Sequence, residues 1–235
     1  MKHLKDHQTG RTLSCMKKLL LLATVATAPG SLLELEEIQG SSRSWSDLKR
    51  SRLEARQRER RIIFNDDSHA LSHEGANTKQ GFLDLRLTAL VGTQADTISW
   101  SVLAGAGDAP SYASRIQPVI CDAQGKALPG MIGPYCENLL ALLQAGHCPL
   151  QMFVDFAHDH KMEAFASVRM NDVHDSFIRD LQTIWKRRHP ELLVETTGVL
   201  PGLELYVTAQ DFSHNEVRQR KLEIIQEICD RYDVD

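Results

Sequence analysis

Acidic and polar side chains gather in two short segments of the chain, 65–67 and 169–175. Their carboxylates can transfer protons or accept hydrogen bonds from hydroxyl groups. Arg169, Asn171 and His174 add the donors that a ligand with neighbouring hydroxyls would need. Together with one aromatic ring, the candidate ligand-binding residues are Asn65, Asp66, Asp67, Trp100, Arg169, Asn171, Asp172, His174 and Asp175. The sequence assigns none of them as a catalytic residue or as a metal ligand.

Each of these residues also has an ordinary structural interpretation. Arg169 can pair with an acidic neighbour, Asp172 can cap a turn, and Asp67 can lie in a surface loop. For any single residue the two interpretations are evenly balanced. The grouping of Arg169, Asn171 and Asp172 within four positions favours a functional role for that set.

Strands that alternate with helices must position these segments. The predicted strands are 61–65, 96–103 and 163–170, and the predicted helices are 81–90, 137–145, 150–160 and 177–188. This order predicts an α/β fold with a parallel sheet, because parallel neighbours need crossover connections. Each polar segment lies at the end of a strand, where α/β folds form their sites. No glycine-rich phosphate loop follows the first strand, which disfavours a nucleotide-binding doubly wound sheet.

Three further segments complete the pattern of predicted elements. A Gly- and Pro-rich connection spans 104–135, and 203–208 has the composition of a short strand. The final helix is predicted to begin with a capping box, Ser213-x-x-Glu216, in which each end of the motif satisfies a backbone N–H of the first turn. Its apolar face is marked by Val217, Ile224, Ile225, Ile228 and Tyr232.

Charge divides the chain into two parts. Residues 1–61 hold 13 basic and 7 acidic side chains, whereas the rest of the chain holds 14 basic and 24 acidic ones. The acidic part argues against nucleic acid as a partner, because phosphates require patches of Lys and Arg. The basic run 49–61 is interpreted as a solvated helix or linker. The longest apolar run is far shorter than a membrane span needs, so no membrane span is expected.

The N-terminal segment 1–60 contains a candidate signal peptide at 16–28. Met16-Lys17-Lys18 precede an apolar stretch that ends in Ala26-Thr27-Ala28, an A-x-A-like cleavage site. A signal there predicts a secreted or periplasmic protein. The alternative is an apolar helix that packs on the main domain, 61–235, of a cytoplasmic protein.

The cysteines and histidines form no metal-binding pattern. The five cysteines include no C-x-x-C pair and their number is odd, which argues against structural zinc and against a redox motif. Asp155 and His158 can share a helix face but His160 does not, so we interpret this segment as a solvated helix end. We therefore expect neither a metal nor a cofactor.

Five motifs follow one another from residue 61 onward. They are R-I-I-F-N-D-D at 61–67, F-L-D-L-R at 82–86, A-S-V-R-M-N-D-V-H-D at 166–175, H-P-E-L-L-V at 189–194 and D-F-S-H-N-E-V-R at 211–218. Together they resemble the family-10-like glycosyl hydrolases of bacteria, which are (β/α)8-barrel glycosidases. The R-M-N-D-x-H-D part is the most specific of these matches, whereas N-D-D alone is weak.

This resemblance implies an incomplete (β/α)8 TIM-type barrel. It covers 61–235, and family members continue beyond Tyr232–Asp235, so the chain would hold roughly the first three to four of eight βα units. The acid/base and nucleophile carboxylates of the family are expected on later strands, so no residue of this chain is assigned to either role. Ser68 stands where relatives often have glycine, which also weakens the assignment of any family role to His69.

The function that the resemblance implies is hydrolysis of O-glycosyl bonds in a polysaccharide or oligosaccharide. That reaction needs two carboxyl groups that flank the scissile bond, one of them with a raised pKa. Asp66, Asp67, Asp172 and Asp175 are the carboxyl groups present, and they are expected to bind sugar hydroxyls. Trp100 is the aromatic residue best placed to stack on a sugar.

Two alternative functions stay open. The chain can be a non-catalytic carbohydrate-binding remnant of such an enzyme, or a metal-dependent hydrolase that uses Asp66, Asp67, His69 and distant histidines. On the first two hypotheses the chain alone is expected to show no turnover. An incomplete barrel is also expected to be marginally stable, because it exposes an unpaired strand edge.

Overall fold

The computed structural model describes residues 44–104, 109–119, 133–178, 181–194 and 207–235. All of them belong to one compact unit, Leu35–Asp235, whereas the other unit, Met1–Glu34, lies outside the described residues. The candidate signal peptide and most of the strand predicted at 203–208 therefore also lie outside them.

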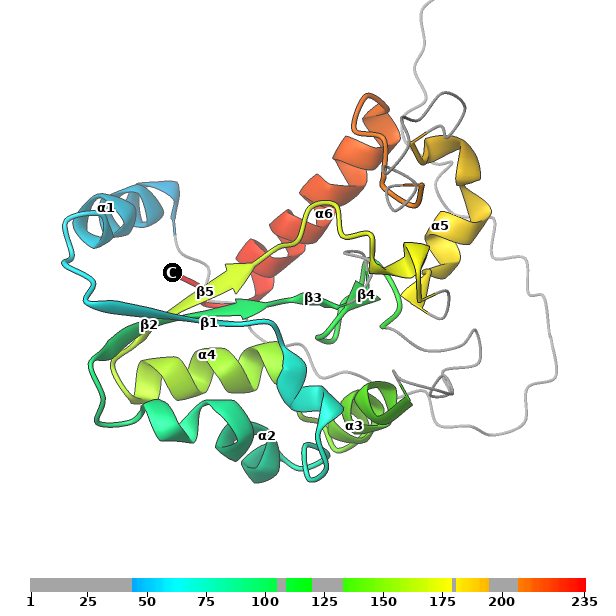
Figure 1. The fold of residues 1–235 in the computed structure, drawn as a ribbon. Coiled ribbons are helices and arrows are strands. Elements are labelled where there is room, and N and C mark those ends of the chain that lie inside the picture. Colours follow the sequence, from blue (N-terminus) through cyan, green and yellow to red (C-terminus); the bar gives the residue numbers. More distant parts are fainter. Residues whose placement is uncertain (1–43, 105–108, 120–132, 179–180, 195–206) are drawn as a thin grey trace, which may run out of the picture. The chain divides into compact units, whose positions relative to one another are not determined.

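The described chain contains helices and strands in a mixed order (Figure 1). The helices are α1 (Trp45–Ala55), α2 (Lys79–Arg86), α3 (Gly133–Gln144), α4 (Pro149–Asp159), α5 (Ile184–Arg188) and α6 (Asn215–Arg231). The strands are β1 (Ile62–Asp66), β2 (Ala95–Ser101), β3 (Leu103–Ala104), β4 (Ala109–Pro110) and β5 (Glu163–Ser167). Short 3-10 helices lie at His69–Ser72, Thr88–Leu90, His174–Ser176 and Pro190–Leu192. None of the helices in this part of the chain is long and apolar enough to cross a membrane.

The main sheet is parallel and holds three strands in the order β1-β2-β5. Trp100 of β2 is in register with Asp66 of β1 and Ala166 of β5. The predicted α/β fold with a parallel sheet is confirmed. β3 and β4 form a separate antiparallel pair at the start of the segment that the sequence predicts as a long connection, and β3 takes in the last residue of the strand predicted at 96–103.

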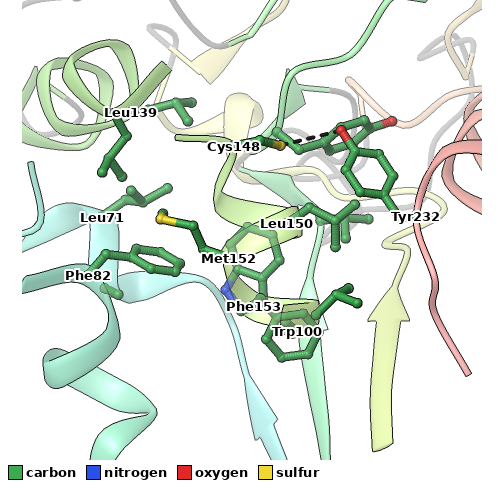
Figure 2. Packing of buried hydrophobic residues seen from close by; sticks show 14 of the residues in the cluster. Leu71, Phe82, Trp100, Leu139, Cys148, Leu150, Met152, Phe153 and Tyr232 are labelled. Carbon is green, nitrogen blue, oxygen red and sulfur yellow. Dashed lines mark hydrogen bonds between the residues drawn. The ribbon is translucent and has the colours of Figure 1, made fainter. Parts of the chain in front are cut away.

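The indole ring of Trp100 packs between the two helices that connect these strands (Figure 2). The ring of Phe153, from α4, is stacked on it with the centroids 5.7 Å apart. The ring of Phe82, from α2, meets it edge-on at 6.1 Å. Because one side chain of β2 contacts both helices, α2 and α4 cover the same face of the sheet.

Helix α6 packs against the same core. Ile224 and Ile228 are buried, as the predicted apolar face of the final helix requires. At the end of the helix, the Tyr232 hydroxyl lies 3.4 Å from the Cys148 sulfur, at the start of α4 (Figure 2). The Tyr232 ring also meets the Tyr112 ring edge-on, with the centroids 5.7 Å apart. Thus the end of α6 lies next to the start of α4.

The capping box predicted for the final helix is wrong. Helix α6 begins at Asn215, with His214 as its N-cap and no side-chain hydrogen bond at that cap. The Ser213 backbone N–H instead donates to the Asp211 carboxylate at 2.8 Å. An aspartate that accepts from the backbone two residues on forms a turn, and this turn displaces the helix start by one position.

Two predicted elements are longer than the observed ones. The helix predicted at 177–188 is reduced to α5, because Thr183 accepts a hydrogen bond from the Lys186 backbone N–H and so defines a later helix start. The strand predicted at 163–170 ends at Ser167. The residues that follow it leave the sheet and enter the polar contacts described below.

The basic segment before β1 is joined to the sheet by a buried ion pair. Glu163, only 2% exposed, accepts from Arg60 Nε at 2.5 Å and from the Thr97 hydroxyl at 2.9 Å. The Arg60 guanidinium also lies 5.5 Å from the centre of the Phe165 ring. Helix α1 has mostly exposed side chains, as a solvated helix should, but the run predicted as a linker is anchored at its end.

The outer edge of β5 is met by the segment that follows α6. The backbone N–H of Asp235 donates to the Ala164 carbonyl at 3.0 Å, and the Ala164 N–H donates to the Asp235 carboxylate at 2.9 Å. A strand that follows a crossover helix would pair with β5 at this edge.

We predict that Trp100→Ala destabilises the fold by about 3 to 5 kcal/mol, because it removes a fully buried ring that two helices share. Urea unfolding followed by circular dichroism measures this change. Leu222→Ala, at a 59% exposed position of α6, is the matched apolar control and should change stability by less than about 0.5 kcal/mol. Equal effects of the two substitutions would contradict the packing described for Trp100.

Candidate functional site

Arg169 brings together the polar residues that follow β1 and β5. Its Nη2 lies 3.0 Å from the Asp67 carboxylate, and its Nη1 lies 2.7 Å from the Asp172 carboxylate. Asp67 is half exposed and Asp172 is buried, so the guanidinium links a surface carboxylate to an interior one. The structure therefore links the segments that follow β1 and β5 at one edge of the sheet, although β2 lies between those strands.

Asp172 also fixes the imidazole of His174. One carboxylate oxygen accepts from the His174 backbone N–H at 2.9 Å and meets the ring Nδ1 at 2.5 Å. Burial opposes ionisation of Asp172, but its hydrogen bonds with His174 and Arg169 outweigh that cost and lower the pKa of the carboxyl. Burial lowers the pKa of Arg169, but its hydrogen bonds to Asp172 and Asp67 outweigh that effect and raise the pKa of the guanidinium. Asp172 is therefore ionised at neutral pH and holds the half-exposed ring of His174 in one orientation.

Asp66 has the opposite electrostatic character. It is 4% exposed, and burial raises the pKa of its carboxyl, although a hydrogen bond from the Ser68 backbone N–H opposes that shift. Its second oxygen is buried and has no hydrogen-bond partner in the described structure. An unpartnered buried carboxylate oxygen is costly when charged, which agrees with the raised pKa of this side chain.

A buried hydroxyl pair lies near Asp66 and was missed by sequence reasoning. The Tyr135 and Ser111 hydroxyls are 2.5 Å apart, and burial raises the pKa of Tyr135 to about 12. Ser68, which also hydrogen-bonds Tyr135, has a φ of 62°, a backbone conformation that favours glycine. The one sequence signal for this cluster was Ser68 itself, because the glycosyl hydrolases that the motifs resemble often have glycine at this position.

Both polar atoms of the Asn171 side chain pair with the backbone of Gln210. Its side-chain oxygen accepts from the Gln210 backbone N–H at 2.7 Å, and its nitrogen donates to the Gln210 carbonyl at 3.0 Å. This pairing imitates a β-ladder between the end of β5 and the segment before α6. We therefore assign Asn171 a positioning role and leave it out of the ligand-contacting set.

Asp175 belongs to the interior. Its carboxylate receives the Lys186 ammonium at 3.1 and 3.2 Å and the Thr208 hydroxyl at 2.7 Å, and both charged side chains are fully buried. A ligand at the surface cannot reach this carboxylate. The sequence could not reveal this pair, because Lys186 was interpreted as part of a basic helix end.

Trp100 and Asn65 lie on opposite faces of the sheet. Trp100 is 1% exposed inside the core, so the prediction that its ring stacks on a sugar has no support in this structure. Asn65 is exposed and in register with Ser99, on the sheet face opposite to Asp66 and the helices. Its side chain therefore points away from the layer in which Asp66 is buried.

Phe177 is a further residue that sequence reasoning did not select. Its side chain is 58% exposed, the second highest value among the large apolar residues exposed in the described structure. Its ring lies against His174, with the centroids 5.4 Å apart and the planes at 59°. The sequence placed Phe177 at the start of a helix, where an aromatic residue signals packing rather than exposure.

No group of three or more His, Cys, Asp or Glu side chains in the described ranges is arranged to hold a metal ion. His69 is exposed, next to the buried Ser68. His158 lies 3.0 Å from the Asp235 carboxylate and 3.9 Å from that of Asp233, which makes it part of the contact between α4 and the segment after α6. The interpretation of His158 as a helix-end residue agrees with these contacts.

Comparison with known proteins gives no family for this chain. No family model matches it, and no curated protein matches it. The functional assignment below rests on the geometry of the site and on the sequence motifs.

We predict that Asp66→Asn increases the free energy of unfolding relative to wild type, and that this increase is larger at neutral pH than in acid. In the folded protein the pKa of Asp66 is raised above its ordinary value of 3.8. The ionised form is then disfavoured, so Asp66 lowers stability progressively as pH rises through the folded pKa, whereas below 3.8 it is protonated in both states.

Urea unfolding of wild type and Asp66→Asn at about pH 4 and about pH 8 measures this dependence. The gain from the substitution should be larger at the higher pH. Asp159→Asn, which removes an exposed carboxylate from the end of α4, is the control. A loss of stability in Asp66→Asn that grows with pH would show that the carboxylate has an ionic partner.

Lys186→Met should destabilise the protein by about 3 to 5 kcal/mol, because it leaves the Asp175 charge buried without its partner. Adding Asp175→Asn to that variant should restore part of the loss, since the uncompensated charge is removed. Denaturant unfolding of the single and double variants measures both effects. A single variant as stable as wild type would contradict a buried ion pair.

Proposed function

We propose that the chain forms part of a (β/α)8-type glycoside hydrolase barrel and binds a carbohydrate at the C-terminal edge of its parallel sheet. The observation that carries this proposal is the position of Arg169, which joins the carboxylates that follow β1 and β5. Polar side chains from different strands converge at this edge in α/β barrels, and their active sites lie there.

The arrangement of the strands and helices supports a barrel more than an open doubly wound sheet. The three parallel strands are adjacent in sequence order, and α2 and α4 cover one face of the sheet. A doubly wound sheet reverses its strand order at a switch point and carries helices on both faces. A barrel keeps its helices outside and its strands in order.

The charges of the site favour the binding of a neutral, hydroxyl-rich ligand. Asp67, Asp172 and Arg169 together carry one net negative charge, and their oxygens and N–H groups can serve as acceptors and donors for sugar hydroxyls. Glycoside hydrolysis also needs a protonated carboxyl group. Asp66 has the raised pKa, but it is buried, so we assign these residues to binding and expect no turnover from them alone.

A glycan ligand fits the export that the sequence predicts from residues 16–28, and a secreted or periplasmic location is part of this proposal. The non-catalytic alternative predicts the same binding and, for this chain alone, the same absence of turnover. The metal-dependent alternative gains no support from the described residues, which offer no ligand cluster.

The proposal is tested by titrating the full chain with cellohexaose, xylohexaose, chitohexaose and mannohexaose in a calorimeter. At least one of these should bind, and Arg169→Ala should weaken that binding by about tenfold or more, because it frees two carboxylates and removes a charged donor. Arg187→Ala, an exposed arginine of α5, should bind as wild type does.

Two results would contradict the proposal. Failure of all four oligosaccharides to bind would remove the carbohydrate site, and equal binding by Arg169→Ala and Arg187→Ala would locate it elsewhere. A colorimetric assay for released reducing sugar on the same ligands separates binding from hydrolysis, and we expect it to stay at background.

A further inference from the structure

We propose that Phe177, beside His174, is the platform on which the apolar face of a pyranose ring stacks at this site. This inference rests on the proposed function and names the part of the site that selects a sugar ring. It replaces Trp100, which the core encloses, as the aromatic residue for a carbohydrate.

The position of Phe177 is fixed by a chain of contacts that begins at β5. Arg169 holds Asp172, and Asp172 binds both the backbone and the ring of His174. The His174 ring then contacts the Phe177 ring, and the Phe177 backbone N–H donates to the His174 carbonyl at 3.3 Å. An exposed aromatic ring is thus held in place by a hydrogen-bonded cluster rather than left on a loose loop.

Exposure of so large an apolar side chain suits a ligand with one apolar surface. Phe177 is 58% exposed, and its ring lies against that of His174, so it presents an apolar surface beside a polar ring. A pyranose presents C–H groups on one face and hydroxyls around its rim. It can therefore cover the Phe177 ring while its hydroxyls reach the side chains of His174 and Arg169.

The charges argue against the other ligands that such a surface could take. An anion would meet the carboxylates of Asp67 and Asp172, and a cation would meet Arg169. With Nδ1 of His174 taken by Asp172, Nε2 is the ring nitrogen left to a ligand, and a hydroxyl can donate to it or accept from it. A neutral polyol with a flat apolar face matches this set best.

Substitutions at Phe177 test the platform with whichever hexasaccharide binds in the titration above. Phe177→Ala should weaken binding by about tenfold, and Phe177→Tyr should stay within about threefold of wild type, because it keeps the ring. Leu222→Ala removes an equally exposed apolar side chain from α6 and should leave binding unchanged. Circular dichroism and thermal unfolding confirm that each variant is folded.

Phe177→Trp supplies an independent readout. Its fluorescence, taken as the difference from wild type, should be red-shifted and readily quenched by iodide in the free protein, and protected from iodide when the oligosaccharide is bound. A blue-shifted tryptophan that iodide does not quench would show that protein already covers this ring, and would overturn the inference.

The outcomes also separate this inference from the proposed function. If Arg169→Ala loses binding while Phe177→Ala keeps it, the site stands and the platform is wrong. If no oligosaccharide binds, both are wrong. If Phe177→Ala and Phe177→Tyr weaken binding equally, the ring itself is not what the sugar contacts, and the platform is again wrong.

Discussion

The packing of Trp100 is the interaction on which the rest of this structure depends. Its ring fills the space between Phe82 of α2 and Phe153 of α4, and it projects from the central strand of the parallel sheet. Aromatic pairs of this kind add about 0.5 to 1.5 kcal/mol each beyond the burial of their surface. Because the three strands are parallel, the loops after them emerge at a common edge.

At that edge the electrostatics divide into two environments. Asp172 is paired by Arg169 and His174 and stays ionised, while Asp66 is buried with a raised pKa. Two carboxyl groups whose pKa values shift in opposite directions are a known basis for acid and base roles in enzymes. Here Asp66 is buried, which limits its contact with a ligand. The proposed binding therefore depends on Asp67, Arg169 and Asp172.

The sequence predicted the fold class and the convergence of the strand ends, because both follow from short-range pattern. Strand-helix alternation fixes a parallel sheet, and polar residues after strands must then meet at one edge. It could not predict which side chains face a ligand, since that depends on partners far away in the chain. Asn171 is taken by Gln210, and Asp175 by Lys186, through contacts that no local motif reveals.

The same limit explains the error at Trp100 and the omission of Phe177. Both are aromatic residues near predicted strand ends or helix starts, and periodicity alone does not tell which one the core encloses. The capping box failed for a related reason, because Asp211 competes for the backbone N–H of Ser213. Local rules identified the right elements, and tertiary contacts decided their ends and exposures.

The most direct test of the account is NMR chemical-shift mapping of the full chain with the hexasaccharides. We expect the perturbed resonances to cluster at Asp67, Arg169, His174 and Phe177, with those of α1 unchanged. Perturbations confined to α1 or to the exposed face of α6, or no perturbation at all, would contradict a carbohydrate site at the C-terminal edge of the sheet.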